Sequence, residues 1–375
     1  MERRDVLKYL GMTAGASLGF APLKALAAGT ATAEPSFLLN QLGYLPVRPK
    51  VVTVRGFDPA QANFRLRATA TGEVVWEAAL TAPQMDTASG DSVRQAIFTS
   101  VSRPGDYLVE IAGVRSDSFH VHAEVYTAAL RTTVRSYTGQ RCGCKVDLGG
   151  GYQHPACHLD GAYGATSGKT GPLRNAGGWH DAGDYGRYVV NSGITCGTLL
   201  WAWEMYQHAL RPIDLAIPKL SKTTGRLPDY LEEVLWNLNW MLQLQDADGG
   251  VFHKQTSEHF CAFIMPQDDH LVSEVIGTGA APYKSTCATA DLAAVMAIAA
   301  RCYAEFDSSL ALRFRTAAEK AWQWAMAHPD VPFDNPPGIL TGSYADPHCS
   351  DELAWASAEL WRTTGETKYE RVFLA

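Results

Sequence analysis

The segment GGWHDAGDYGRYVV, residues 177–190, places an imidazole and two carboxylates within five positions. Asp181 and Asp184, with glycines nearby that let the chain bend closely around a ligand, could hold and deprotonate a water molecule. The alternative is helix capping, because Asp is a preferred N-cap and a helix beginning at Tyr185 would directly follow both residues. The aromatic neighbours in the segment favour the first interpretation, because a polar pair surrounded by aromatic rings is typical of a sugar-binding cleft.

Cysteines and histidines cluster just before and inside this segment. QRCGC at 140–144 and ACH at 156–158 precede WHD at 179–181. Thiolate and imidazole are the ligands that zinc prefers, and four of them close a tetrahedral structural site. Such a site would order the adjacent turn. From the residues alone a disulfide between Cys142 and Cys157, with two solvated histidines, stays an equal alternative, and Cys144 is a spare ligand candidate.

The remaining cysteines have no comparable spacing. Cys196, Cys287 and Cys302 lie in apolar segments with helical periodicity and are expected to be core thiols. Cys261 and Cys349 have no evident partner in the sequence.

A second polar glycine turn, DADGGVFHK, covers residues 246–254. It lacks the ligand series of an EF-hand, so calcium is only weakly indicated here. His253 could donate to or accept from a sugar hydroxyl, whereas a plain surface turn is the alternative.

Two kinds of periodicity divide the chain. Residues 34–122 contain seven short runs with alternating or continuous apolar residues, which predicts an all-β, immunoglobulin-like sandwich. Residues 123–375 contain six longer runs with helical periodicity, connected by long polar loops at 139–188 and 246–284. This predicts an all-α toroid or bundle with site residues in its loops. Tryptophans in these runs, such as Trp236 and Trp240 at i, i+4, are expected in the core.

The N-terminus and the charge restrict location and partners. Residues 1–33 contain Arg3-Arg4, a weakly apolar run and small-residue cleavage sites, which predicts a twin-arginine-type export signal and a periplasmic or secreted protein. The run is too short for a membrane anchor, so no membrane association is expected in the mature form. The net charge is −7 without a basic stripe, which argues against nucleic acid as a partner.

Several of these motifs resemble those of one enzyme family. GGWHDAGDYGRYV closely resembles the catalytic-base signature of glycoside hydrolase family 9, the inverting cellulases. NQLGYLP at 40–46 resembles the opening of the immunoglobulin-like domain that precedes the catalytic domain in one branch of that family. QRCG, ACH, DGGVFHK, KSTCATADLAAVMAIAARCY and DELAWASAELWRTTGETKY are similar to successive landmarks of the same family. The resemblance covers nearly the whole mature chain and implies an (α/α)6 barrel after the sandwich.

The resemblance also implies roles for individual residues. Asp184 would be the general base, and Asp181 would help to position the water. A structural zinc ion would be bound by four ligands, namely Cys142, Cys157, His158 and His180. His253 matches a substrate-contacting histidine, and Tyr344 lies near an aromatic contact to the terminal sugar, although GSYADPHC departs from the aromatic-rich pattern of some members. Calcium is expected without identified ligands.

The end of the chain departs from the family pattern. The family barrel has twelve helices, whereas about six are evident here, and its general-acid glutamate would lie beyond Ala375. The chain as given is therefore expected to be an N-terminal fragment that is inactive or weakly active. The carboxylates within it to consider instead are Glu258, Glu274 and Glu352, although Glu352 resembles a barrel-helix residue.

The sequence thus favours inverting hydrolysis of internal β-1,4-glucosidic bonds in cellulose or a related β-glucan. Alternatives are an inverting glycosidase on another β-linked polymer, such as a glucosamine chain, and a non-catalytic carbohydrate-binding protein. A zinc hydrolase is disfavoured, because four protein ligands leave no open coordination position for a substrate or a water molecule.

Overall fold

The computed structural model describes residues 34–173, 177–218 and 227–375. It divides into two compact units, one with the described residues up to Tyr126 and one from Thr127 to Ala375. The predicted export signal, residues 1–33, lies outside the described residues.

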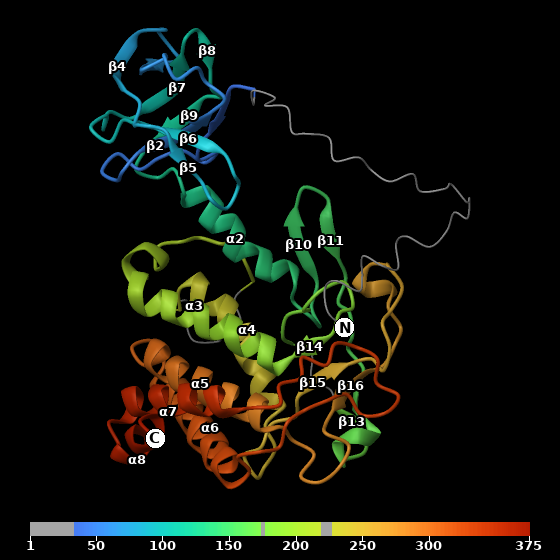
Figure 1. Ribbon diagram of the computed structural model, residues 1–375. Coiled ribbons are helices and arrows are strands. Elements are labelled where there is room, and N and C mark those ends of the chain that lie inside the picture. Colours follow the sequence, from blue (N-terminus) through green and yellow to red (C-terminus); the bar gives the residue numbers. More distant parts are fainter. Residues whose placement is uncertain (1–33, 174–176, 219–226) are drawn as a thin grey trace, which may run out of the picture. The chain divides into compact units, whose positions relative to one another are not determined.

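The first unit is the predicted β-sandwich (Figure 1). One antiparallel sheet has the order β1-β2-β6-β5, formed by Ser36–Leu38, Val51–Arg55, Ser92–Ile97 and Gln84–Met85. The other has the order β4-β3-β7-β8, formed by Val74–Ala79, Asn63–Ala68, Gly105–Ile111 and Val114–Arg115, with β9, Phe119–Val121, paired to β7. All seven predicted strands are confirmed, and the two-residue strands β5 and β8 are additional.

The alternation of buried and exposed residues along each strand explains how the core of the sandwich forms. Val52 and Val54 on β2, like Phe64 and Leu66 on β3, are buried, and the residues between them are more exposed. Because successive side chains of a strand point to opposite faces, this pattern places one apolar face of each sheet inside.

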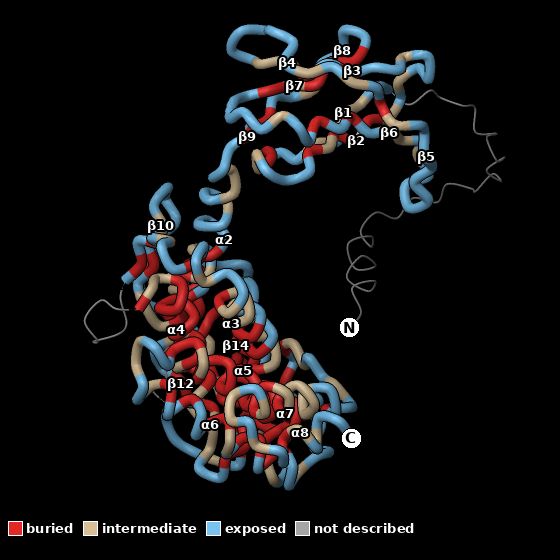
Figure 2. The backbone as a smooth tube through the Cα atoms, turned by 90° about the vertical axis from the view of Figure 1, so that its left-hand side faces the viewer, coloured by how far each residue is buried: buried red, intermediate tan, exposed pale blue. Residues whose placement is uncertain are grey.

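The described residues of the second unit contain the six predicted helices, one short α-helix and two 3-10 helices, Ala165–Ser167 and Pro266–Asp268 (Figure 1). The α-helices are α2 (Thr127–Gly139), α3 (Val189–Leu210), α4 (Asp229–Gln243), α5 (Thr286–Tyr303), α6 (Ser308–Ala327), α7 (Ser350–Thr364) and α8 (Thr367–Phe373). In α5 every residue except Arg301 is buried, and the helix packs against α3, α6 and α7 (Figure 2). Its many alanines let these neighbours approach closely, so α5 is the centre of the helical core.

The predicted long loops contain strands that the sequence did not reveal. β10 (Val146–Gly149) pairs with β11 (Tyr152–His154). A five-stranded sheet has the order β13-β12-β16-β15-β14, formed by Pro172–Leu173, Gly161–Tyr163, Ser273–Ile276, Lys254–Thr256 and Arg187–Tyr188. The expectation of loops without strands at 139–188 and 246–284 was therefore wrong. Strands of two to four residues are too short for a detectable periodicity of apolar residues, which is why the sequence did not indicate them.

Trp236 and Trp240 pack in the helical core, as predicted. Trp240 is fully buried, and Trp236 donates to the carbonyl of Gly178 at 2.9 Å. Among the described residues, no helix is both long and apolar enough to cross a membrane.

Candidate active site and metal cluster

The turn that contains both carboxylates is shaped by close packing and by its glycines. Gly178 has a φ of +79°, and a Cβ there would lie 2.7 Å from the Trp240 ring, so a side chain does not fit. The amide of Asp181 donates to the carbonyl of Gly186 at 2.9 Å, which closes the turn. The helix begins at Val189 rather than at Tyr185, and its N-cap, Tyr188, makes no side-chain capping bond. The capping alternative for the two aspartates was therefore wrong.

Hydrogen bonds hold three of the four carboxylate oxygens. Oδ1 of Asp181 accepts from Asn191 at 2.8 Å, and its Oδ2 accepts from the hydroxyl of Tyr344 at 2.6 Å. Oδ2 of Asp184 accepts from the hydroxyl of Tyr188 at 2.6 Å. Oδ1 of Asp184 is buried and has no hydrogen-bond partner among the described residues. The two carboxylates therefore differ, because only Asp184 has an oxygen without any hydrogen-bond donor among the described residues.

The two tyrosines that donate to the carboxylates also contact each other. The rings of Tyr188 and Tyr344 meet edge to face with centroids 4.7 Å apart. Burial, and then the hydrogen bond to Asp181, raise the pKa of Tyr344 to about 12. Burial and Asp184 likewise raise the pKa of Tyr188 well above its ordinary value. Both phenols therefore remain protonated donors at neutral pH.

His253 lies behind the loop that contains Tyr344. Its ring stacks on Phe333 with centroids 3.7 Å apart, Nδ1 lies 3.0 Å from the Ser285 hydroxyl, and Nε2 lies 3.0 Å from the Ser343 carbonyl. Burial lowers the pKa of His253 to about 3, so the ring is neutral. Both nitrogens are engaged by the protein, and a contact between His253 and substrate, which stays a prediction, requires Ser343 to move.

Lys254, which the sequence did not single out, holds the same loop. Its buried Nζ donates to Asn335 Oδ1 and to the Gly342 carbonyl, both at 2.7 Å. Burial lowers the pKa of Lys254 to about 7, although Asp184 acts in the opposite direction. On the sheet, Lys254 of β15 is paired with Tyr188 of β14. This register, between strands too short to predict, places the ammonium of Lys254 5.6 Å from the centroid of the Tyr188 ring.

The predicted metal ligands come together. The ligand atoms of Cys142, Cys157, His158 and His180 all lie within 4.8 Å of one another, and the Cys157 sulfur lies 3.8 Å from Nε2 of His180. Nδ1 of His158 is buried without a hydrogen-bond partner, while its Nε2 lies 3.1 Å from Asp269 Oδ2. A carboxylate on the far nitrogen of an imidazole is the usual support of a metal-binding histidine.

This donor set fits zinc. In a tetrahedral site with Zn–S near 2.3 Å and Zn–N near 2.0 Å, ligand atoms lie roughly 3.3–3.8 Å apart; the upper limit of 4.8 Å for this cluster is compatible with that spacing. Cys142 and Cys157 are free thiols, which contradicts the alternative of a disulfide between them, and Cys144 stays outside the cluster. A hydrogen bond from Cys142 lowers the pKa of Cys157, which favours the thiolate that a metal requires.

Two cysteines pair in a way that the sequence did not predict. Cys287, expected to be a core thiol, and Cys349, for which the sequence offered no evident partner, form a disulfide across 62 residues of sequence. Cys287 lies in the first turn of α5 and Cys349 is the N-cap of α7. Helical periodicity indicates that Cys287 is buried but not which residue contacts it. The bond fixes the end of the loop 328–349, which contains Tyr344.

A cavity of about 450 Å³ lies beside the two residues that donate to Asp181. Asn191 and Tyr344 line it together with Asp291, Asp351 and Glu352. Burial, followed by the charges of Asp351 and Asp346, raises the pKa of Glu352 to about 7. Burial also raises the pKa of Asp291.

The acidic cluster in this cavity and Glu274 concern two further expectations, the calcium ion and the alternative general acids. Asp346, Asp351 and Glu352 offer oxygen ligands within 4.8 Å of one another, the type that calcium takes, and the expected calcium stays a prediction. Burial and the charge of Glu258 raise the pKa of Glu274, on β16.

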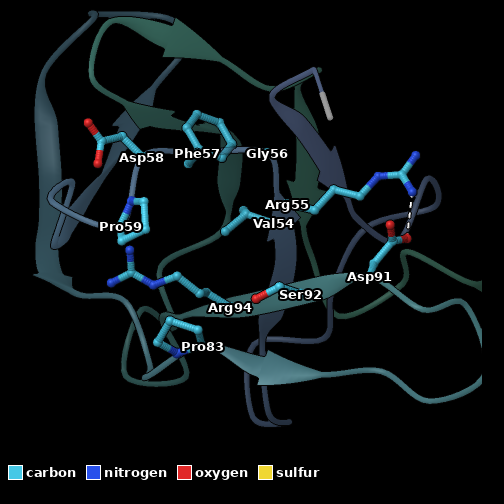
Figure 3. A pocket seen from close by; sticks show the side chains of 10 residues that line it. All are labelled: Val54, Arg55, Gly56, Phe57, Asp58, Pro59, Pro83, Asp91, Ser92 and Arg94. Carbon is cyan, nitrogen blue, oxygen red and sulfur yellow. Dashed lines mark hydrogen bonds and ion pairs between the residues drawn. The ribbon is translucent and has the colours of Figure 1, made fainter. Parts of the chain in front are cut away.

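The sandwich has a cavity of its own, of about 610 Å³ (Figure 3). Phe57, Pro59 and Pro83 line it together with Arg94, and Asp91 at its edge forms an ion pair with Arg55 at 2.6 Å. Both Arg94 hydrogen bonds go to backbone carbonyls, those of Thr81 and Gln61. The lining contains two carboxylates, Asp58 and Asp91, but they lie apart in Figure 3 and do not share one turn as Asp181 and Asp184 do.

Comparisons with known proteins agree with this architecture. A model of glycosyl hydrolase family 9 matches residues 126–375, and a model of the cellulase N-terminal immunoglobulin-like domain matches residues 32–116. Endoglucanase D of Acetivibrio thermocellus is 33% identical over 342 residues, which are 89% of this chain and 52% of that protein. A xyloglucan-specific endo-beta-1,4-glucanase of Bacteroides ovatus is 32% identical over 355 residues, which are 88% of this chain and 58% of that protein.

A solved structure shows the same fold. The structure of AaCel9A in complex with cellobiose-like isofagomine matches with a TM-score of 0.80 and 33% identity, over 90% of this chain and 61% of that chain. The chain thus spans between 52% and 61% of the length of these three proteins. A sandwich followed by helices of an (α/α)6 barrel is the arrangement that they share with it.

Proposed function

The chain belongs to glycosyl hydrolase family 9, and from this premise we propose that it contributes the water-activating side of an inverting β-1,4-glucanase. Asp184 is the general base and Asp181 positions the water. The observation that supports these roles is the difference between the carboxylates, because Oδ1 of Asp184 has no donor among the described residues and both oxygens of Asp181 do.

In the proposed reaction, Oδ1 of Asp184 accepts a proton from a water molecule. The water oxygen bonds to the anomeric carbon as the bond from that carbon to the leaving oxygen breaks. A separate carboxylic acid gives its proton to the leaving oxygen, and the new hydroxyl has the opposite anomeric configuration. In inverting glycosidases the two carboxyl groups lie roughly 6.5–9.5 Å apart on opposite sides of the bond. Asp181 and Asp184 share one short turn, so we assign both to the water side.

Asp181 does not need to accept the proton itself. With Asn191 and Tyr344 donating to its two oxygens, its carboxylate has a fixed orientation and remains a hydrogen-bond acceptor for the water. A fixed acceptor of this kind lowers the cost of ordering the water before attack.

We also propose a structural role for zinc at the cluster of Cys142, Cys157, His158 and His180. Bound zinc would supply a cross-link with no open position for chemistry. His180 directly precedes Asp181, and its amide donates to the Gln140 carbonyl at 2.7 Å. The cluster therefore joins the carboxylate turn to the segments that contain Cys142 and Cys157.

Export of the protein is a further proposal. Arg3-Arg4 supports a twin-arginine-type signal, and the Cys287–Cys349 disulfide is of a kind that persists in oxidising compartments. A β-glucan substrate outside the cytoplasm is consistent with both.

The substrate and the stereochemistry can be tested together. The protein from its complete reading frame is assayed for reducing ends on carboxymethylcellulose, xyloglucan and chitosan, and the first anomer released from cello-oligosaccharide is identified by proton NMR. We expect β-glucan hydrolysis with the α-anomer formed first. Release of the β-anomer would contradict inversion. Hydrolysis of chitosan alone would establish the glucosamine alternative, and binding without hydrolysis would establish a carbohydrate-binding protein.

A further inference from the structure

Tyr188 contacts the reacting carboxylate directly, although nothing in the sequence pattern assigned it a role. It is the second residue of β14 and is almost completely buried. Its hydroxyl donates to Oδ2 of Asp184 at 2.6 Å, and Oδ1 of the same carboxylate has no partner among the described residues.

We propose that Tyr188 is a positioning residue for Asp184, whose hydroxyl holds Oδ2 so that the lone pairs of Oδ1 face the attacking water. The proposal rests on the assignment of Asp184 as general base. A carboxylate rotates readily about its terminal torsion, because the energy profile there is broad. A donor on one oxygen removes that freedom and decides which oxygen acts as the base.

A glycine at position 186 leaves room for the hydrogen bond between Tyr188 and Asp184. Gly186 lies between the two residues, and a Cβ on it would be 2.7 Å from the Tyr188 hydroxyl and 2.8 Å from Oδ2 of Asp184. Any side chain at this position would therefore separate the donor from the acceptor. The glycine at 186 is explained by the hydrogen bond itself.

The tyrosine ring is fixed from several sides. Its backbone is paired with Lys254 of β15, and the next amide, that of Val189, donates to the His253 carbonyl at 3.0 Å. The ammonium of Lys254 lies 5.6 Å from the ring centroid, and the ring of Tyr344 packs against the edge of the Tyr188 ring. A donor held this firmly loses little conformational entropy when it bonds to the carboxylate, which is the condition for precise orientation.

The central variant is Tyr188→Phe, which removes only the hydroxyl. We expect kcat on cello-oligosaccharide to fall by about 10- to 100-fold, the scale of a misplaced catalytic group, while KM changes by less than about twofold. The acid limb of the kcat/KM profile should move to higher pH, because a lost donor to the ionised form raises the pKa of a carboxyl group. The titratable groups that interact electrostatically with Asp184 are Tyr188, Lys254, Cys261 and Tyr344.

Tyr230→Phe is the matched control. Tyr230 is equally buried, and its hydroxyl donates to the Leu199 carbonyl at 2.9 Å within the helical core. We expect this variant to lose thermal stability to a similar extent and to keep the wild-type kcat and pH profile. If Tyr188→Phe matches Tyr230→Phe in kcat and in pH profile, the proposal is wrong. A raised KM with unchanged kcat would also overturn it, because Tyr188 would then bind substrate instead.

Two further variants complete the test. If Tyr188→Phe does not fold, Gly186→Ala keeps the hydroxyl but separates it from Asp184, and the same fall in kcat is expected; an unchanged kcat would refute the proposal. Asp184→Asn is assayed alongside. An active Asp184→Asn would contradict the general-base assignment itself, whereas an inactive one beside a fully active Tyr188→Phe would contradict only the positioning role.

Discussion

The hydroxyl of Tyr344 lies 2.6 Å from Oδ2 of Asp181, although 163 residues of sequence separate them. The loop 328–349 therefore supplies a hydrogen-bond donor to the turn that contains Asp181 and Asp184. The loop is held by Lys254, by His253 and by the disulfide at Cys349.

Removal of the Tyr344 hydroxyl tests this contact. A hydrogen bond to a charged group contributes about 1.5–3 kcal/mol, so we expect Tyr344→Phe to lower kcat/KM by about 10- to 100-fold. The phenylalanine keeps the ring, so a role limited to stacking on the terminal sugar would leave kcat/KM unchanged. Steady-state kinetics on cello-oligosaccharides separates the two roles.

The disulfide is expected to contribute to stability. Cross-links that close long loops typically stabilise by about 2–4 kcal/mol. We therefore expect the double variant Cys287→Ser/Cys349→Ser to unfold at lower denaturant concentration than the wild type. Cys144→Ala, which removes an unpaired thiol outside the cluster, is the control. A wild-type protein in which alkylation and mass spectrometry detect free Cys287 and Cys349 would contradict the pairing.

The zinc proposal predicts one ion per chain by elemental analysis. His180→Ala should lose the metal, lower the Tm and reduce activity, because the turn beside it is no longer cross-linked. Asp269→Asn, which replaces the carboxylate beside Nε2 of His158 by an amide, should weaken zinc binding by about 10- to 100-fold. Protein without stoichiometric zinc would contradict the proposal. So would a His180→Ala variant that loses activity while keeping its metal and its Tm.

Acid stability should depend on Asp246. Burial alone would raise the pKa of Asp246, but hydrogen bonds from Lys169 and Lys284 outweigh it and lower the pKa from 3.8 to about 2. The stabilisation is therefore present above the unfolded pKa near 3.8 and is lost as the pH falls through 2. The Tm difference between wild type and Asp246→Asn should shrink between pH 5 and pH 2. Asp248→Asn, on the same turn but with a side chain 46% exposed, should show a smaller difference; equal behaviour would contradict the account.

Local pattern predicted the elements better than their contacts. The strands of the sandwich and the helices follow from periods of two and 3.6 residues, because one face of each is buried. The metal cluster could be predicted from the sequence because Cys157 and His158 are adjacent. The hydrogen bonds from Tyr188 and Tyr344 to the carboxylates could not be predicted, and neither could the position of Lys254 beside Tyr188, because they depend on a strand register and on a loop without periodicity. The disulfide partner of Cys287 could not be predicted either, because Cys349 lies at the end of the same loop.

The central claim is that Asp184 removes the proton from the attacking water. The most direct measurement compares kcat of Asp184→Asn with that of wild type, using the protein from its complete reading frame, with calorimetric binding of cello-oligosaccharide to show that the variant still binds. The account predicts that kcat falls by about 10²- to 10⁴-fold with binding largely retained. Near-normal turnover by Asp184→Asn would contradict the account and transfer the role to another carboxylate, with Asp181 the first to test.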